Sequence, residues 1–391
     1  MRYLINILLF CSLLTSVLSC KRTSHCNSLP YIVNLHQDEL TGEKGIEKGV
    51  SGCFVGVANG YLVVAGGCNF PDNPVSEGGH KRFYKGIYTT PVGDSLQWKK
   101  IGALPMPAAY GVSVMKDNSL IFIGGSNSEN KLTLVTQVVI SDKGVSQTLL
   151  PSLPWGIDNM AGGYLNNKIY ILGGTRKGKP SNQVLSLDFE NLSAGWVEES
   201  SFPGNPRIQL ISFVRDNEIY LYGGFAPCSD QNSASISTDG LVYNEGEWRI
   251  LESPLSSDST IISLSGASVT YHGDDVFAFG GVHSAIFLEA LKREELMQHC
   301  SNVRQLDSLK KAQYDYLVQD RFWYRFNSDV LLFDSVKRQW VSVGKHKELA
   351  RAGAAVASYK SDIYIIGGEL KPGVRTPHTV QIKTNKLNNR I

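Results

Sequence analysis

A glutamate and an arginine six residues apart are the residues of this sequence best suited to chemistry. The segment GGELKPGVRT, residues 367–376, places Glu369 directly after two glycines and Arg375 beyond the turn residues Pro372 and Gly373. A turn of this kind folds the carboxylate and the guanidinium toward one point. A carboxylate accepts and returns protons, and an arginine binds a substrate carboxylate through two parallel hydrogen bonds. The pair predicts acid–base chemistry on a small anionic molecule, although a plain solvated loop has the same composition.

Other catalytic signatures are absent from the sequence. It has no GxSxG elbow, no P-loop, no HExxH pair and no dinucleotide fingerprint. The seven cysteines include no CxxC pair, and no histidine–cysteine spacing is typical of a metal site. We therefore expect no cofactor and no metal. The formal net charge of +2, without a long basic run, argues against nucleic acid as a partner.

A repeat defines the elements that must position the Glu369 loop. An apolar run ending in two glycines occurs six times: YLVVAGG at 61–67, LIFIGG at 120–125, IYILGG at 169–174, IYLYGG at 219–224, VFAFGG at 276–281 and IYIIGG at 363–368. Each run follows another apolar run and a polar turn, such as Asn166-Asn167, which is a two-residue hairpin signal. Glycines suit these positions because a Cβ would clash where neighbouring units crowd.

Four strands per unit, with a period of about 50 residues, are typical of a kelch β-propeller. The sequence therefore predicts an all-β, six-bladed kelch β-propeller over residues 31–391. The last blade lacks a good fourth strand after Lys383, and we expect the segment YIVNLHQ, residues 31–37, to supply it by pairing the first strand with the last.

One stretch interrupts the repeat. No glycine lies between Gly281 and Gly344, and apolar residues there recur at helical spacing. We expect two helices at about 285–298 and 302–318, within an insertion of about 284–326 in blade five, positioned to cover the site as a lid.

The order of strands in a blade also predicts which residues share a face. The loop after each glycine pair lies on the same face as the connection to the next blade, so Glu369 and Arg375 share a face with further polar residues. We expect four of these to bind substrate, although a salt bridge or a turn hydrogen bond is the competing interpretation for each: Asn69, Arg207, His283 and Arg351.

The N-terminus has the pattern of a secretory signal peptide. Arg2 precedes an apolar stretch from Tyr3 to Leu18, followed by Ser19 and Cys20. We expect a signal peptide over residues 1–19 and a linker over 20–30. Val-Leu-Ser-Cys resembles the bacterial lipobox, so we expect an exported, periplasmic lipoprotein attached to the membrane through Cys20, with ordinary cleavage nearby as the alternative.

Cys53 and Cys68 flank one expected hairpin and are the best candidates for a disulfide, with free buried thiols as the alternative.

Several segments resemble those of bacterial N-acetylneuraminate mutarotases (N-acetylneuraminate epimerases), a kelch family. They are GGELKPGVRT, GGVHSAIF, FNSDVLLFD, RAGAAVASY, GVSGCFVGVANGYLVVAGG and AAYGVSVMKDNSLIFIGG. In the better-known members the glutamate blade lies mid-chain and precedes the GVSG-like hairpin. Here that blade ends the chain and GVSG begins it, so the sequence resembles the circularly permuted branch of the family.

The resemblance implies an isomerase that interconverts the α and β anomers of N-acetylneuraminate (sialic acid). Glu369 and Arg375 match the catalytic pair of the family: the glutamate moves the proton of the anomeric hydroxyl and the arginine holds the sugar carboxylate. The expected partner is thus a small acidic sugar, and the expected assembly is a monomer or weak dimer. Two alternatives stay open, a non-catalytic kelch binding module and a mutarotase or isomerase of another acidic sugar.

Overall fold

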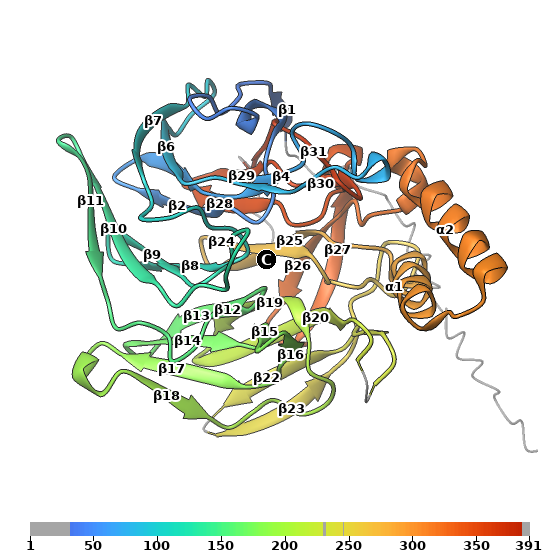
Figure 1. Ribbon diagram of the computed structural model, residues 1–391. Helices are drawn as coiled ribbons and strands as arrows, with labels where there is room; N and C mark the ends of the chain where they lie inside the picture. Colours follow the sequence, from blue (N-terminus) through green and yellow to red (C-terminus); the bar gives the residue numbers. More distant parts are fainter. Residues whose placement is uncertain (1–31, 230–231, 245, 385–391) are drawn as a thin grey trace, which may run out of the picture.

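The computed structural model describes residues 32–229, 232–244 and 246–384. These residues form mostly antiparallel β-sheet, with two α-helices standing at one side (Figure 1). The expectation of an all-β protein with a short helical insertion agrees with this architecture. The signal peptide expected over 1–19, Cys20 and the linker expected over 20–30 lie outside the described residues.

Six antiparallel sheets of at least four strands follow one another around a common centre (Figure 1). In chain order, sheet one holds β2 (Phe54–Ala58), β3 (Tyr61–Ala65), β6 (Gly86–Pro91) and β7 (Lys99–Ala103); sheet two holds β8 (Val112–Lys116), β9 (Ser119–Ile123), β10 (Val135–Ser141) and β11 (Gly144–Leu149); sheet three holds β13 (Ala161–Leu165), β14 (Lys168–Leu172), β17 (Val184–Asp188) and β18 (Trp196–Glu199).

Sheet four holds β19 (Ile208–Arg215), β20 (Glu218–Ala226), β22 (Gly240–Asn244) and β23 (Glu247–Leu251), with β21 (Ser235–Ile236) beside β20; sheet five holds β24 (Ala267–His272), β25 (Asp275–Gly280), β26 (Asp329–Asp334) and β27 (Gln339–Lys345); sheet six holds β28 (Ala355–Tyr359), β29 (Asp362–Ile366), β32 (Thr379–Lys383) and β1 (Ile32–His36).

Small hairpins and 3₁₀ turns join these sheets. They are β4 (Cys68–Asn69) with β5 (Arg82–Phe83), β12 (Ile157–Asp158) with β15 (Thr175–Arg176) and β16 (Lys179–Pro180), β30 (Glu369–Lys371) with β31 (Val374–Arg375), and the turns η1 (Ile46–Lys48), η2 (Val75–Glu77), η3 (Leu192–Ala194), η4 (Arg321–Tyr324) and η5 (Lys347–Leu349).

The repeated glycine pairs have a direct steric cause. Both glycines of each pair adopt positive φ, between 59° and 72° at the first and between 86° and 104° at the second. A Cβ on Gly66 would lie 2.2 Å from the carbonyl oxygen of Ala108, in the segment that leads to the next sheet, and the N–H of Gly67 donates to that same oxygen at 2.8 Å. The chain therefore turns away from each hairpin in close contact with the neighbouring sheet, as the sequence predicted. The expected Asn166-Asn167 turn is also present, with φ of 49° and 61°.

A ring of backbone hydrogen bonds joins all six sheets near the centre. Six residues with positive φ lie at or just before the first strand of each sheet, and each N–H donates to the carbonyl of the member before it at 2.7–3.0 Å. The last carbonyl in chain order accepts from the first N–H, so the ring is complete. Its members are Gly52, Tyr110, Asn159, Gln209, Gly266 and Gly353.

The N-terminal strand completes the last sheet. Strand β1 pairs antiparallel with β32, from Ile32 opposite Lys383 to His36 opposite Thr379, which confirms the first-to-last pairing predicted for this segment. Sheet six then packs on sheet one through a buried cluster that includes Leu62. Similar clusters fill the other five contacts between neighbouring sheets, so the hydrophobic core is divided among these interfaces.

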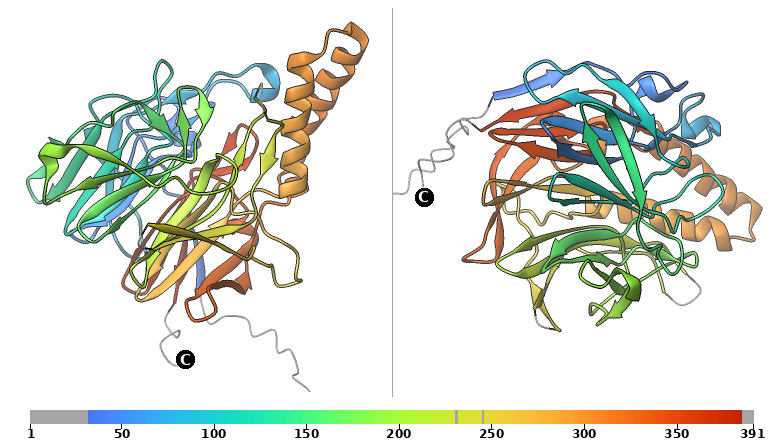
Figure 2. Two further views of the ribbon diagram at one scale, coloured as in Figure 1. Left: turned by 90° about the horizontal axis from the view of Figure 1, so that it is seen from below. Right: turned by 90° about the vertical axis from the view of Figure 1, so that its left-hand side faces the viewer.

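The helical insertion lies where the sequence predicted it. Helices α1 (Ser284–His299) and α2 (Val303–Leu317) follow β25 and stand at the end of the sheets that carries the small hairpins (Figure 2). The ring of Phe287 on α1 packs edge-on against Phe225 of β20, with centroids 4.9 Å apart. Beyond α2, the backbone carbonyl of Gln319 accepts a hydrogen bond from Lys371 Nζ at 2.7 Å. The insertion therefore reaches from sheet four to the loop that carries Glu369.

None of the helices in the described part of the chain is both long and apolar enough to cross a membrane.

Candidate active site

The hairpin β30–β31 sets Glu369 directly opposite Arg375. Pro372 and Gly373 form its turn, where Gly373 has a φ of 80° and donates its N–H to Glu369 Oε1 at 2.8 Å. The other carboxylate oxygen, Oε2, lies 3.2 Å from Arg375 Nη2. The turn thus brings the two charges together, as their spacing predicted.

The Arg375 side chain is buried, and one of its guanidinium nitrogens makes no hydrogen bond to the described residues. Its side chain is 4% exposed, whereas that of Glu369 is 25% exposed. Nε donates to Ser51 Oγ at 3.0 Å, and the guanidinium lies over the ring of Phe70 at 5.1 Å. Nη1 is buried without a hydrogen-bond partner among the described residues. An unsatisfied charged donor in the interior is costly, so Nη1 retains the capacity to donate a further hydrogen bond.

The Arg375 guanidinium keeps its proton and its positive charge. Burial lowers the pKa of this guanidinium, but its polar neighbours, first among them the Glu369 carboxylate, raise it by more, and the net pKa lies above the usual value. Arg375 therefore remains a cation at neutral pH.

A tyrosine completes the polar surroundings of the pair. Tyr110 belongs to the central ring of hydrogen bonds, and its hydroxyl accepts from Lys81 Nζ and from the Cys68 thiol, each at 3.2 Å. Lys81 also lies over the Tyr110 ring at 4.8 Å. Burial, and next the neighbouring Cys68, raise the pKa of Tyr110 well above its usual value, so the hydroxyl keeps its proton and remains a donor.

The cysteines near this tyrosine are free thiols. The structure contains no disulfide between Cys53 and Cys68, which resolves the alternative left open by the sequence. Burial raises the pKa of Cys53 to about 12, so this thiol stays protonated.

Asn69 and Arg351 hydrogen-bond to partners other than the Glu369–Arg375 pair. Asn69 is buried; its Nδ2 donates to the carbonyls of Gly45 and Gly49 at 2.7 and 2.8 Å, and its Oδ1 accepts from Tyr84. Both ends of the amide are therefore engaged by protein. Arg351 donates three hydrogen bonds to backbone carbonyls, of which the one to Gly367 measures 2.8 Å.

Burial lowers the pKa of Arg351 to about 10. Its Nη2 has no partner among the described residues.

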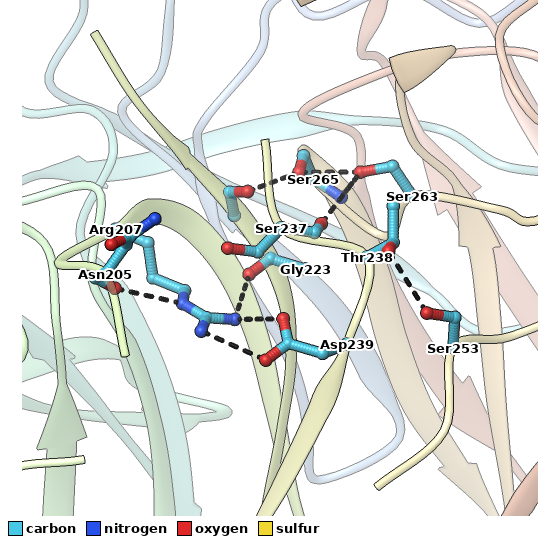
Figure 3. A network of polar contacts seen from close by, with 10 residues as sticks. Asn205, Arg207, Gly223, Ser237, Thr238, Asp239, Ser253, Ser263 and Ser265 are labelled. Carbon is cyan, nitrogen blue, oxygen red and sulfur yellow. Dashed lines mark hydrogen bonds and ion pairs between the residues drawn. The ribbon is translucent and has the colours of Figure 1, made fainter. Parts of the chain in front are cut away.

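Arg207 occupies in sheet four the place that Arg351 has in sheet six. Its Nη1 donates to the carbonyl of Gly223, the first glycine of its own sheet's pair, at 3.2 Å, and to Asp239 at 2.9 Å (Figure 3). The Arg207 side chain is 3% exposed, and both Asp239 oxygens accept from its guanidinium. Arg207 and Arg351 thus both donate hydrogen bonds to backbone carbonyls. Substrate binding by either residue stays a prediction.

His283 lies at a different place from the Glu369–Arg375 pair. Its Nδ1 accepts from the N–H of Ile286 at the start of α1, and the ring lines a pocket of about 410 Å³ beside η4 and the 256–263 loop. In the described part of the chain, His283 makes no hydrogen bond or ion pair with Glu369 or Arg375. Substrate binding by His283 stays a prediction, and the pocket is considered separately below.

Ser51 and Phe70 are the site residues that sequence reasoning missed. Ser51 is 324 positions from the arginine that it contacts, and only the pairing of the chain ends brings the two together. The GVSG segment that contains Ser51 stood out by its family likeness, which was the available signal. Phe70 follows the Cys68–Asn69 strand and carried no signal of its own. Among the described residues no group of three or more histidine, cysteine, aspartate or glutamate side chains is arranged to hold a metal ion.

A family model described as N-acetylneuraminate epimerase matches residues 32–146 and 150–390. The chain belongs to the N-acetylneuraminate epimerase family. A Haemophilus influenzae (strain PittEE) protein named N-acetylneuraminate epimerase is 28% identical over 233 residues, 60% of this chain and 59% of that protein. The Yersinia enterocolitica protein of the same name is 29% identical over 237 residues, 60% of this chain and 57% of its own length. The chain thus aligns with less than two thirds of these relatives.

A solved structure described as "Structure of YjhT" matches with a TM-score of 0.49 and 27% identity, covering 58% of this chain and 62% of that one.

Proposed function

We propose that this protein interconverts the α and β anomers of N-acetylneuraminate by acid–base opening and closing of the sugar ring. The observation that carries the proposal is the buried Arg375, whose Nη1 has no partner among the described residues, ion-paired at 3.2 Å with the partly exposed Glu369. In this sugar the anomeric carbon bears both a carboxylate and the anomeric hydroxyl. A guanidinium and a carboxylate side by side match those two groups.

The reaction divides between the two side chains. Arg375 Nη1 binds the sugar carboxylate, while Glu369 takes the proton of the anomeric hydroxyl. The bond between the anomeric carbon and the ring oxygen breaks, and the ring oxygen receives a proton to become a hydroxyl. The resulting ketone turns by rotation about a single bond, and the reverse steps close the ring on its other face. Protons are returned and no oxidant, reductant or cofactor is consumed.

Tyr110 is placed to assist the second proton transfer. Its hydroxyl keeps its proton and already accepts from Lys81, so it has its own hydrogen to donate. A donor beside the Glu369–Arg375 pair stabilises negative charge that develops on the ring oxygen.

The fold and processing that accompany this function are also proposals. We propose that the six sheets are the blades of one closed kelch propeller, circularly permuted relative to better-known family members; the ring of six hydrogen bonds and the six buried interfaces support this. The short alignments to the relatives are consistent with permutation. Export, removal of residues 1–19, lipid attachment at Cys20, a periplasmic location, and a monomeric or weakly dimeric state rest on the sequence alone.

Proton NMR of freshly released α-N-acetylneuraminate tests the proposal. The full chain is expected to speed the appearance of the β anomer, and Glu369→Gln to reduce that acceleration by about 10²- to 10⁴-fold, the usual contribution of a general base. The comparison is made at a temperature where circular dichroism shows both proteins folded. A native protein that leaves the spontaneous rate unchanged refutes catalysis on this sugar.

Two outcomes separate the alternatives. Acceleration with a different acidic sugar, and none with N-acetylneuraminate, favours an isomerase of that other sugar. Saturable binding without acceleration for any acidic sugar favours a non-catalytic binding module.

A further inference from the structure

We propose that the pocket beside His283 is a second binding site, separate from the Glu369 hairpin, for a sugar that carries a carboxylate. The pocket has a volume of about 410 Å³, within the range of small-molecule sites. Its walls are the 256–263 loop that precedes sheet five, the turn η4 with the residues after it, and residues 345–350 that lead to sheet six.

The turn η4 separates this pocket from the catalytic hairpin. Tyr324 of η4 is buried in the insertion, where its hydroxyl donates to the Tyr316 carbonyl. Burial raises the pKa of Tyr324 to about 12, with a smaller contribution from the nearby Glu369 carboxylate. Arg321 and Phe322 of the same turn, with Arg325 just after it, line the pocket instead. The two sites therefore lie on opposite sides of one short helix, and neither shares a lining residue with the other.

Cations outnumber the carboxylates available to neutralise them in the pocket. Lys345 lies 3.9 Å from the buried Asp329, and Arg321 lies 3.3 Å from Glu348. Arg325 and Lys347, which also line the pocket, have no carboxylate within ion-pair distance in the described part of the chain.

The remaining carboxylate of the pocket does not serve these two cations. Asp258 accepts hydrogen bonds from Ser256 Oγ and from the N–H of Thr260, within its own turn. Asp258 nevertheless keeps its negative charge. Four cations (Arg321, Arg325, Lys345 and Lys347) therefore face three carboxylates (Asp258, Asp329 and Glu348), and the excess of one positive charge attracts an anion.

Arg325 ends η4 with φ of 50° and ψ of 39°, the left-handed conformation that glycine or asparagine usually supplies at a helix end. An arginine in this conformation costs about 1 kcal/mol relative to glycine. Other non-glycine residues of the chain share it, so the case for a ligand rests on the guanidinium, which has no carboxylate partner among the described residues.

Apolar side chains give the pocket its second character. Ile261 and Phe322 are 54% and 53% exposed, and Val282 and Phe326 line the same cavity. A small inorganic anion leaves such surface bare, whereas a sugar ring covers it with its C–H faces while its carboxylate reaches Arg325. The ligand class is thus a carboxylated sugar; the choice of N-acetylneuraminate as the first probe rests on the proposed function.

Equilibrium dialysis of the full chain against radiolabelled N-acetylneuraminate tests this site by stoichiometry. The native protein is expected to bind two equivalents and Arg325→Gly one. Because glycine relieves the left-handed strain, this variant is expected to unfold at or above the native temperature, which excludes misfolding as the cause of lost binding. Lys360→Gly is the matched control: Lys360 is also a cation with positive φ, 52°, but lies in the β28–β29 turn at the opposite end of the sheets, and its variant is expected to bind two equivalents.

Failure of this inference and failure of the proposed function predict different numbers of sugar molecules bound per chain. If the Glu369 site binds no sugar, the native protein binds one equivalent and Arg325→Gly none, and the second site stands. Equal stoichiometry for the native protein and Arg325→Gly overturns it.

Competition defines the ligand chemistry. The neutral sugar N-acetylmannosamine and inorganic sulfate, each at tenfold excess, are expected to leave the Arg325-dependent equivalent bound. Displacement of that equivalent by sulfate reduces the pocket to a simple anion site and overturns the assignment to a sugar.

Discussion

Neutralising Glu369 is expected to destabilise the fold more than removing the charge of Arg375, although Glu369→Gln is the more conservative change. The reason is the unequal burial of the two partners, since 4% of the Arg375 side chain is exposed against 25% of Glu369. Glu369→Gln leaves a buried guanidinium without its anion. Arg375→Met leaves a carboxylate that reaches water and keeps the hydrogen bond from Gly373.

The magnitudes follow from the contacts. Two unit charges 3.2 Å apart attract by about 5 kcal/mol at an effective dielectric constant of 20. Removing one partner of a buried pair costs about 3–5 kcal/mol of stability. We expect Glu369→Gln to cost about 3 kcal/mol, because Ser51 and Phe70 still contact the guanidinium. Arg375→Met is expected to cost about 1–2 kcal/mol, close to one lost hydrogen bond. The double variant, which buries no unpaired charge, is expected to be more stable than Glu369→Gln alone.

Urea unfolding followed by tryptophan fluorescence measures these differences, and a melting scan is expected to fall by about 4 °C for Glu369→Gln and about 2 °C for Arg375→Met. The pair of Lys131 and Asp158, 2.7 Å apart, is a control with the opposite burial: the lysine is 31% exposed and the aspartate 6%. There, Lys131→Met is expected to cost more than Asp158→Asn. The reasoning is refuted if Arg375→Met loses more stability than Glu369→Gln. It is also refuted if the variant of the anion costs more than the variant of the cation in both pairs, or less in both.

Three further outcomes are expected. Gly280→Ala places a Cβ 2.2 Å from the Arg351 carbonyl oxygen at a φ of 72°, so thermal unfolding should show a loss of stability of more than about 2 kcal/mol. The control Gly144→Ala should lose about 1 kcal/mol, because its added Cβ meets nothing within 4 Å. Burial, and next the nearby Arg325, lower the pKa of His283 in the folded protein. The unfolded chain therefore binds more protons, and the free energy of unfolding should fall as the pH drops from 7 to 5. His283→Asn keeps a side chain that caps α1, and its free energy of unfolding in urea should fall less over the same pH range. Tyr110→Phe should slow anomer conversion about 10- to 100-fold in the NMR assay, and an unchanged rate would restrict the hydroxyl to a structural role.

Local patterns of the sequence predicted the elements well because their causes are local. The glycine pairs repeat since each hairpin meets the next sheet at about the same distance, and the steric demand is visible as the residue type. The unpaired edge of the last sheet similarly required a strand, and the 31–37 segment was apolar enough to supply it.

The roles of individual polar residues were less accessible. Tyr110 and Gln209 adopt positive φ in the central ring, where glycine is the usual signal, so residue type did not indicate their backbone conformation. Tyr110 does lie in AAYGVSVMKDNSLIFIGG, one of the segments with a family likeness. Arg207 and Arg351 share a face with Glu369, yet each donates to the carbonyl of its own sheet's first glycine. Sequence alone does not distinguish an arginine that binds backbone from one that binds substrate, since both need a cation at the same place in the repeat.

The position of β1 relates the proposed membrane anchor to the proposed site. Ile32 pairs with Lys383, and Lys383 pairs with Asp362 beside the β28–β29 turn, whereas Glu369 follows the other end of β29. The chain therefore enters the last sheet at the end away from the catalytic hairpin. Thirteen residues run from Cys20 to Ile32, and their twelve steps span at most about 43 Å when fully extended. A lipid on Cys20 would therefore be joined to the folded part of the chain at the end of the sheets away from the Glu369 hairpin.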